Sequence, residues 1–140
     1  QLAHFTLGNR KILLACPETY INLSGEAVVA IRNFYKIDIS QIIVIHDDVD
    51  LNLNKVKTKI GGSTGGHNGL KSIDSKIGNQ YLRLRVGVGR PDNVKPLSNY
   101  VLECFSKDEQ STMDQIKQKF IENFDIIAKQ DINEIQTIFN

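Results

Sequence analysis

The alternation of apolar and polar residues predicts two strands and a helix in the first third of the chain. Lys11–Ala15 and the wholly apolar Ile42–Ile45 are typical of buried strands, the second covered on both faces. Between them, Ser24 is a candidate N-cap for a helix. The apolar residues of this helix recur at helical spacing: Ala27, Val28, Ile31, Phe34 and Tyr35. Strand, helix and strand in this order predict a right-handed βαβ unit.

The middle of the chain repeats the same order of elements. A strand is predicted over Lys55–Ile60 and a flexible loop over Gly61–Gly66. The helix that follows stops at Gly78, and its apolar face carries Leu70, Ile73 and Ile77. The next strand has a period of two, which points Arg83 and Arg85 away from its apolar residues, Leu82, Leu84, Val86 and Val88.

The last third of the chain is predicted to be helical after an irregular connection at Pro91–Leu97. Ser106 and Glu109 have the spacing of a capping box. They open a long amphipathic helix with Met113, Ile116, Phe120, Phe124 and Ile127 on one stripe. A final helix carries Ile132, Ile135 and Ile138. The whole order predicts an α/β fold, a mixed sheet with helices on both faces.

Length and composition indicate one folded domain. The chain has 140 residues, of which 41% are hydrophobic and 24% charged. Its apolar runs are far shorter than the ~20 residues of a membrane-spanning helix. The sequence starts without Met, which leads us to expect a fragment or a processed form. Cys16 and Cys104 are too far apart for a zinc site, so we expect two reduced thiols, packed as small hydrophobic side chains, and a cytoplasmic location.

Charge is distributed unevenly along the chain. Residues 55–95 hold nine basic and two acidic side chains, a net charge of +7, whereas the rest of the chain carries −6. Such a segment suggests a positive surface for a partner rich in phosphate, and a chance cluster on a solvated surface is the alternative.

The first candidate site is the acidic stretch from His46 to Asp50, at the end of a predicted strand. Ligands of open α/β sheets bind at such strand ends, and a carboxylate there can orient a histidine. Asp47, first out of the strand, is the preferred functional carboxylate. For Asp48 and Asp50 we favour a solvated acidic turn, and a divalent cation bound by all three carboxylates is a further possibility.

The second candidate site is the glycine loop with His67 and Asn68 at the entrance of the following helix. Backbone N–H groups at such an entrance suit an anion or oxyanion, but the spacing fits neither a Walker A loop nor a dinucleotide fingerprint. Asn68 can hold a carbonyl or a water, or it can merely cap the helix. A weaker candidate is Tyr20 with Asn22, where the amide could equally belong to a turn.

Two classes of chemistry are not expected. The chain has no Gly-x-Ser-x-Gly elbow, and the spacing of His4, His46 and His67 is not that of a zinc site. We therefore expect neither covalent catalysis nor a metal or other cofactor.

Taken together, these segments resemble the bacterial peptidyl-tRNA hydrolase family. The stretches that match it, in its order and spacing, are 17–25, 46–51, 61–73 and 82–89, and the segment Gly-Gly-His-Asn-Gly-Leu at 65–70 is highly specific. The resemblance implies one domain over residues 1–140, truncated at the amino terminus, with a twisted mixed β-sheet sandwiched between helices. It implies hydrolysis of the ester between a peptide and its tRNA, which recycles peptidyl-tRNA released from stalled ribosomes.

The resemblance also implies roles for individual residues. A histidine acts as general base on a water, and Asp47 holds that histidine. Asn22 and Asn68 position substrate and water, and Tyr20, with Ile21 and His67, lines the site for the tRNA end. Lys59 and Arg85 hold the 5′-phosphate of the acceptor stem, and the connection after Arg90 matches a mobile gate.

Two departures from the family pattern stand out. None of the three histidines matches the general base, which follows an amino-terminal strand and a Gly-Asn-Pro-Gly loop that this chain lacks. A fragment of that kind is expected to be inactive and poorly stable. Ile21 stands where the family usually has Met, a side chain of similar volume but softer. The alternative function is a non-catalytic RNA-binding relative, similar to a splicing factor of this fold, and in either case we expect a monomer.

Overall fold

The structure is a computed structural model that describes residues 1–90 and 105–139. Its contacts divide the chain into two compact units, Gln1–Ile43 with Ile60–Leu82 and Val44–Lys59 with Arg83–Asn140. The irregular connection predicted at Pro91–Leu97, the mobile gate implied after Arg90, and Cys104 lie outside the described residues.

The first unit begins with a β-hairpin. Strands β1 (Leu2–Leu7) and β2 (Arg10–Ala15) pair in antiparallel register, from Leu2 opposite Ala15 to Leu7 opposite Arg10. Strand β1 was not predicted. It pairs with β2 in antiparallel register, whereas the βαβ interpretation gave β2 a parallel neighbour. The predicted βαβ unit is therefore wrong, because within the described residues β2 pairs in a sheet separate from the other strands.

Helices α1 (Ser24–Tyr35) and α2 (Asn68–Ile77) complete the first unit, with the short helices η1 (Ile21–Leu23) and η2 (Ile39–Gln41). The predicted face of α2 is buried, and Gly78 ends the helix with φ +79°. Ser24 is not the N-cap of α1, since its hydroxyl donates to the Ile21 carbonyl (2.8 Å) and Leu23 holds the cap position.

Helix α1 contacts α2 through its first turn. The Gly25 N–H donates to Ser72 Oγ (2.8 Å), and Glu26 pairs with Lys76 (2.8 Å). A Cβ on Gly25 would lie 2.2 Å from the Ser72 carbonyl oxygen, so the two backbones meet where only glycine fits. Phe34, in the last turn, lies far along the helix from these contacts. It is 79% exposed, although its spacing placed it on the apolar face.

Cys16 differs from its prediction. It is exposed at the end of the hairpin, so it is not packed as a small hydrophobic side chain. The reason is local, because the chain from Ala15 to Leu23 is exposed throughout.

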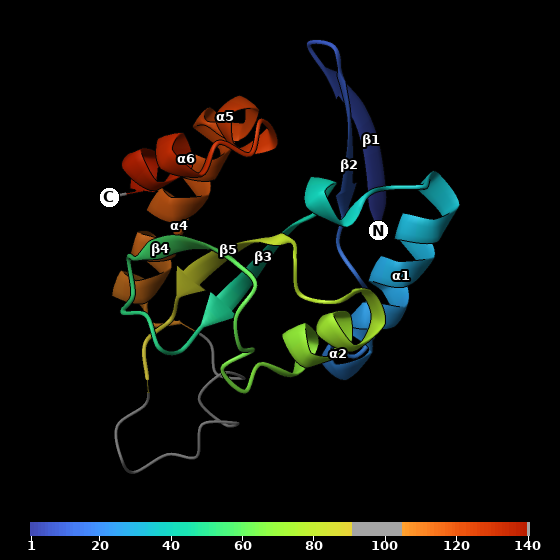
Figure 1. The fold of residues 1–140 in the computed structure, drawn as a ribbon. Coiled ribbons are helices and arrows are strands. Elements are labelled where there is room, and N and C mark those ends of the chain that lie inside the picture. Colours follow the sequence, from blue (N-terminus) through green and yellow to red (C-terminus); the bar gives the residue numbers. More distant parts are fainter. Residues whose placement is uncertain (91–104, 140) are drawn as a thin grey trace. The chain divides into compact units, whose positions relative to one another are not determined.

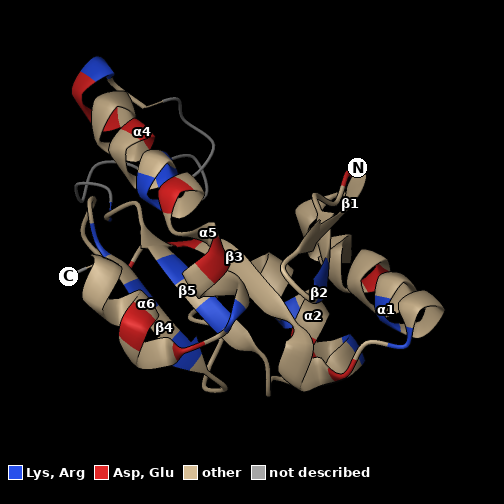
Figure 2. Ribbon diagram, turned by 90° about the horizontal axis from the view of Figure 1, so that it is seen from above, with Lys and Arg blue, Asp and Glu red and all other residues tan. Residues whose placement is uncertain are grey.

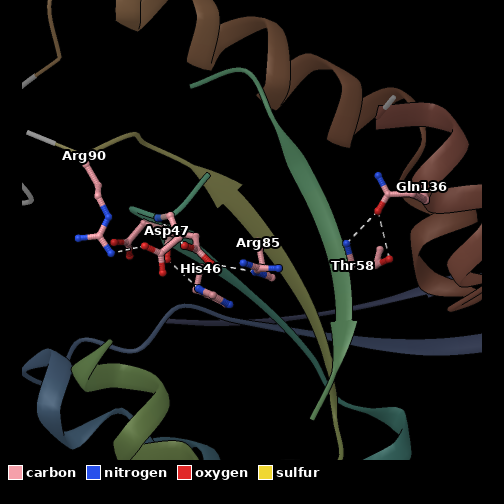
Figure 3. A network of polar contacts seen from close by, with 8 residues as sticks. His46, Asp47, Thr58, Arg85, Arg90 and Gln136 are labelled. Atoms are coloured by element: carbon pink, nitrogen blue, oxygen red, sulfur yellow. Dashed lines mark hydrogen bonds and ion pairs between the residues drawn. The ribbon is translucent and has the colours of Figure 1, made fainter. Parts of the chain in front are cut away.

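A three-stranded sheet forms from β3 (Ile43–Asp48), β4 (Val56–Ile60) and β5 (Leu82–Gly87), in the order β3-β5-β4. Leu82 N–H donates to the Ile42 carbonyl and Val88 N–H to that of Asp48, so β3 and β5 run parallel, as their arrows show in Figure 1. Strand β4 runs opposite to β5 (Figure 3). The predicted mixed sheet is confirmed.

The central strand is β5, and its position in the sheet explains the burial. Leu84 is 0% and Arg83 1% exposed, so both faces of β5 are covered. Ile45, on the outer strand β3, is 51% exposed, so β3 is not covered on both faces as predicted. Neighbours on both sides shield a central strand, and an outer strand lacks one of them.

Three helices follow in the second unit: α4 (Lys107–Glu122), α5 (Phe124–Ala128) and α6 (Ile132–Phe139). The capping box is confirmed, since Ser106 Oγ accepts from Glu109 N–H (3.2 Å) and Glu109 Oε1 from Ser106 N–H (3.0 Å). The predicted long helix is broken at Asn123, whose amide donates to the Lys119 carbonyl (2.9 Å). The helices bury an apolar set: Ile116, Ile127, Ile135 and Phe139. None of the helices in residues 1–90 or 105–139 could cross a membrane.

The close approach of α1 and α2 predicts an unusual sign for one substitution. Gly→Ala within a helix stabilises it by about 1 kcal/mol on propensity alone. Gly25→Ala should instead lower the free energy of unfolding by about 1–3 kcal/mol, because the added Cβ overlaps backbone. Urea unfolding measures the difference. Asn33→Ala, on an exposed position of the same helix, is the control, and a stabilised Gly25→Ala protein would contradict the packing.

Candidate functional site

Helix η1 and the start of α2 form the first candidate region, within one unit. The two elements pack together, and an ideal Cβ on Gly69 would lie 3.0 Å from Ile21 Cδ1. Ile21 therefore rests against a position that carries no side chain. Asn22 and Asn68, each one residue from this contact, come from segments far apart in the sequence and lie on the two elements that meet here.

The side chains of this region are open to solvent. Tyr20 is 81% and Ile21 58% exposed, and Asn22 and Asn68 are also exposed. Exposed aromatic and aliphatic groups beside two amides offer a stacking face together with hydrogen-bond donors and acceptors. Such a surface suits a ligand that has both flat apolar and polar parts.

His67, not Asn68, caps helix α2. Its Nδ1 accepts a hydrogen bond from the Leu70 N–H (3.2 Å), which leaves Asn68 as the first residue of the helix. The alternative in which Asn68 is only a cap is therefore wrong. The loop before the helix takes positive φ at Gly61, Gly62, Gly65 and Gly66, a conformation that favours glycine.

The second region lies at the end of β3, in the other unit. Asp47 is exposed, and it lies within the strand rather than beyond it, because β3 continues to Asp48. His46 Nδ1 donates to the Asp47 carbonyl (2.7 Å), which places a proton on that nitrogen (Figure 3). This hydrogen bond involves the backbone carbonyl of Asp47 and not its side-chain carboxylate. Asp47 itself is exposed.

Asp48 and Asp50 are ion-pair partners rather than a solvated turn. Arg85 Nε donates to Asp48 Oδ2 (2.8 Å), and the two side chains are 24% and 14% exposed. Arg90 pairs with Asp50. The first pair forms because Asp48 and Arg85 lie on the neighbouring parallel strands β3 and β5. Strand β4 and helix α2 separate these two strands in the sequence, so the sequence does not show that they are neighbours. Residues 1–90 and 105–139 contain no group of three or more side chains able to hold a metal ion.

Basic side chains follow β4 and β5, which Figure 2 shows in blue. The Gly87 N–H donates to the Lys55 carbonyl (2.8 Å), which in an antiparallel pair sets Lys57 opposite Arg85. Lys59 is exposed, two residues further along the same face of β4. Part of the excess positive charge of residues 55–95 is therefore gathered on two adjacent strands.

Comparison with known proteins identifies the family. The family model described as peptidyl-tRNA hydrolase matches residues 1–140. The chain is a member of the peptidyl-tRNA hydrolase family. A relative from Rickettsia bellii strain RML369-C, named peptidyl-tRNA hydrolase, is 46% identical over 137 residues, which are 98% of this chain and 74% of the relative. One from Aliarcobacter butzleri strain RM4018 is 49% identical over 127 residues, 91% of this chain and 69% of the relative.

Solved structures agree with the sequence relatives. The crystal structure of peptidyl-tRNA hydrolase from Acinetobacter baumannii matches with a TM-score of 0.89 and 32% identity, and covers 98% of this chain and 70% of that one. The predicted α/β fold and the predicted family are confirmed. Family membership favours a hydrolase over the non-catalytic RNA-binding alternative.

The structure groups the predicted site residues of this family member into two sets. Tyr20, Ile21, Asn22, His67 and Asn68 lie together in the unit of α1 and α2. The remaining three belong to the unit of the sheet: Asp47, Lys59 and Arg85. The Asp48–Arg85 pair was not predicted, because the predicted strand ended at Ile45 and Asp48 was assigned to a solvated turn.

The Asp48–Arg85 pair predicts a pH dependence of stability. Burial raises the pKa of the Asp48 carboxyl, but hydrogen bonds from Arg85 and the Asp50 N–H and the charge of Arg85 outweigh it, and the pKa falls below its ordinary value of 3.8. The folded state therefore favours the charged carboxylate, and the stability this contributes is present above pH 4 or so and lost as the pH falls through the lowered pKa.

Asp48→Asn should lower the free energy of unfolding at pH 7 by about 1–2 kcal/mol, since one charge of the pair is removed. Between about pH 5 and pH 2 the variant should lose less stability than the parent protein. Urea titrations at a series of pH values measure both effects, with the exposed Asp125→Asn as control. Equal pH dependence in the Asp48 variant and the parent would contradict the role of the pair.

Proposed function

We propose that the protein that contains these residues hydrolyses the ester bond between a peptide, or an N-blocked amino acid, and the terminal ribose of tRNA, with Asn22, Asn68 and Asp47 in the chemistry. Family membership supports the reaction. The observation that supports the residue assignment is the contact between η1 and α2, the elements that carry the exposed residues Asn22 and Asn68.

Ester hydrolysis needs an oriented water, a base and donors for the developing oxyanion. In this proposal Asn68 and Asn22 position the water and the carbonyl, because an amide carries both donors and an acceptor. The N–H groups at the start of α2 lie beside Asn68 and add positive character. Tyr20, Ile21 and His67 line the site, where an exposed aromatic ring suits the last base of the tRNA.

The base in this proposal is a histidine oriented by Asp47. The three histidines of residues 1–140 have other contacts: His4 Nε2 lies 3.1 Å from the Tyr35 hydroxyl, His46 bonds the Asp47 carbonyl, and His67 caps α2. None of them is assigned as the base. Asp47 would stabilise the protonated imidazole as a neighbouring carboxylate does in a catalytic triad.

The phosphate contacts are assigned to Lys59 and Arg85. Asp48 holds the guanidinium of Arg85 through Nε, and four further N–H donors of an arginine remain for a phosphate. A held side chain loses less conformational entropy on binding. Contacts of this kind position a nucleic acid without reading its sequence.

The partner is then the acceptor stem and 3′ end of peptidyl-tRNA. We place the activity in the cytoplasm, where ribosomes release this substrate, and assign residues 1–140 to a single domain like that of peptidyl-tRNA hydrolases, in a protein that works as a monomer without a metal or other cofactor.

Asn68→Ala should reduce kcat/KM for N-acetyl-aminoacyl-tRNA about 100-fold or more, the loss expected when a positioned donor is removed. Asp47→Ala should reduce it as well, mainly through kcat. The measurement is release of the N-blocked amino acid by the protein translated from the complete reading frame that contains these residues. Asn33→Ala, an exposed amide on α1, is the control. Full activity of both variants would overturn the assignment.

Lys59→Gln should weaken tRNA binding and reduce the slope of log Kd against log salt by about one unit, because one phosphate contact releases about one counterion. Fluorescence anisotropy across a range of salt concentrations measures the slope. Lys119→Gln, an exposed position on α4, should leave the slope unchanged. A parent-like slope for Lys59→Gln would remove this residue from the phosphate contact.

A further inference from the structure

Strand β4 forms one edge of the three-stranded sheet, and its outer backbone groups need partners. In an antiparallel pair, alternate residues turn their N–H and C=O groups toward the neighbouring strand and away from it. The Lys55 carbonyl accepts from Gly87 N–H, so by the alternation of an antiparallel pair Lys57 and Lys59 turn their backbone groups toward β5. Val56 and Thr58 turn theirs outward, where an open edge would be exposed.

Gln136, from helix α6, occupies this outer edge. Its Oε1 accepts hydrogen bonds from the Thr58 N–H (3.0 Å) and the Thr58 hydroxyl (3.3 Å), and its Nε2 donates to the Val56 carbonyl (3.1 Å), as drawn in part in Figure 3. A side-chain amide has the donor and acceptor of a peptide group. Gln136 thus bonds β4 in the place of one residue of a further strand.

The contact bonds β4 at Val56 and Thr58, the two residues on either side of Lys57. Successive residues of a strand point to opposite faces, so Thr58 points away from the face of Lys57 and Lys59. Both lysines are exposed. With β5 on the inner edge and Gln136 on the outer edge, β4 is bonded on both sides at the residue beside Lys59.

We propose that Gln136 is a positioning residue for tRNA binding, which holds β4 so that Lys59 meets a phosphate of the acceptor stem. This inference rests on the proposed function, because it requires the phosphate contact of Lys59. An edge strand that is hydrogen-bonded on one side alone can twist and fray. A lysine on a frayed strand spends less time in the position from which it can contact the phosphate.

The test compares binding of unacylated tRNA with and without a 5′-phosphate to the protein from the complete reading frame. The parent protein should bind the phosphorylated tRNA more tightly. Gln136→Leu should reduce this preference about threefold, the effect of misplacing one exposed charge contact. Gln115→Leu, at an exposed position of α4, should leave it unchanged. In a Lys59→Gln background, Gln136→Leu should change the preference no further, because both substitutions act on one contact.

The results distinguish a failure of the role of Gln136 from a failure of the phosphate contact of Lys59. If Lys59→Gln does not alter the preference or the salt slope, the phosphate contact itself is wrong, and the inference falls with it. Suppose that Lys59→Gln alters the preference and the slope, but Gln136→Leu weakens binding of both tRNAs equally or its effect adds fully to that of Lys59→Gln. Gln136 then has only a structural role.

A second variant covers the case in which Gln136→Leu does not fold. Gln136→Glu keeps the hydrogen-bond acceptor for Thr58 and loses the donor to Val56. A reduced preference in that variant supports the inference, and an unchanged one overturns it.

Discussion

The contact between the first turn of α1 and the middle of α2 is the constraint on which the candidate active surface depends. Gly25 bonds Ser72 Oγ, and a side chain on Gly25 would overlap the Ser72 backbone. Because η1 runs directly into α1, this approach also holds η1 against the start of α2, where Ile21 rests against Gly69. Gly25 thus allows two backbones to meet, Gly69 leaves room for the Ile21 side chain, and the elements that carry Asn22 and Asn68 are brought into contact.

The sheet places its charged groups by a different means. Arg85 lies on the central strand, where Asp48 of the neighbouring strand holds its Nε, and Lys59 lies on an edge strand whose outer backbone is bonded by Gln136. In the first case a carboxylate holds the guanidinium itself, and in the second a glutamine bonds the strand that carries the lysine. Under the proposed function, Arg85 would lose little conformational entropy when it binds a phosphate, because Asp48 already holds its side chain.

Local sequence patterns predicted most elements correctly. The strand at 55–60, the helix that ends at Gly78 and the capping box of Ser106 and Glu109 are all confirmed, because each depends on neighbours within a few residues. The failures concern partners at a distance. Strand β2 pairs with β1 rather than in a βαβ unit, and Asp48 is an ion-pair partner rather than a solvated residue.

The sequence by itself determined the α/β class, the family and the identity of the polar residues near the proposed chemistry. Hydrophobic periodicity and short motifs depend only on residues close together in the sequence, so they can be recognised without the structure. Tertiary structure decided which of the elements that carry these residues are in contact, which carboxylate binds which arginine, and that a glutamine of the last helix bonds the edge of β4. Hydrogen bonds and ion pairs between elements depend on distances in space. Nothing in the sequence around Thr58 or Gln136 indicates that these two residues, far apart in the chain, are hydrogen-bonded.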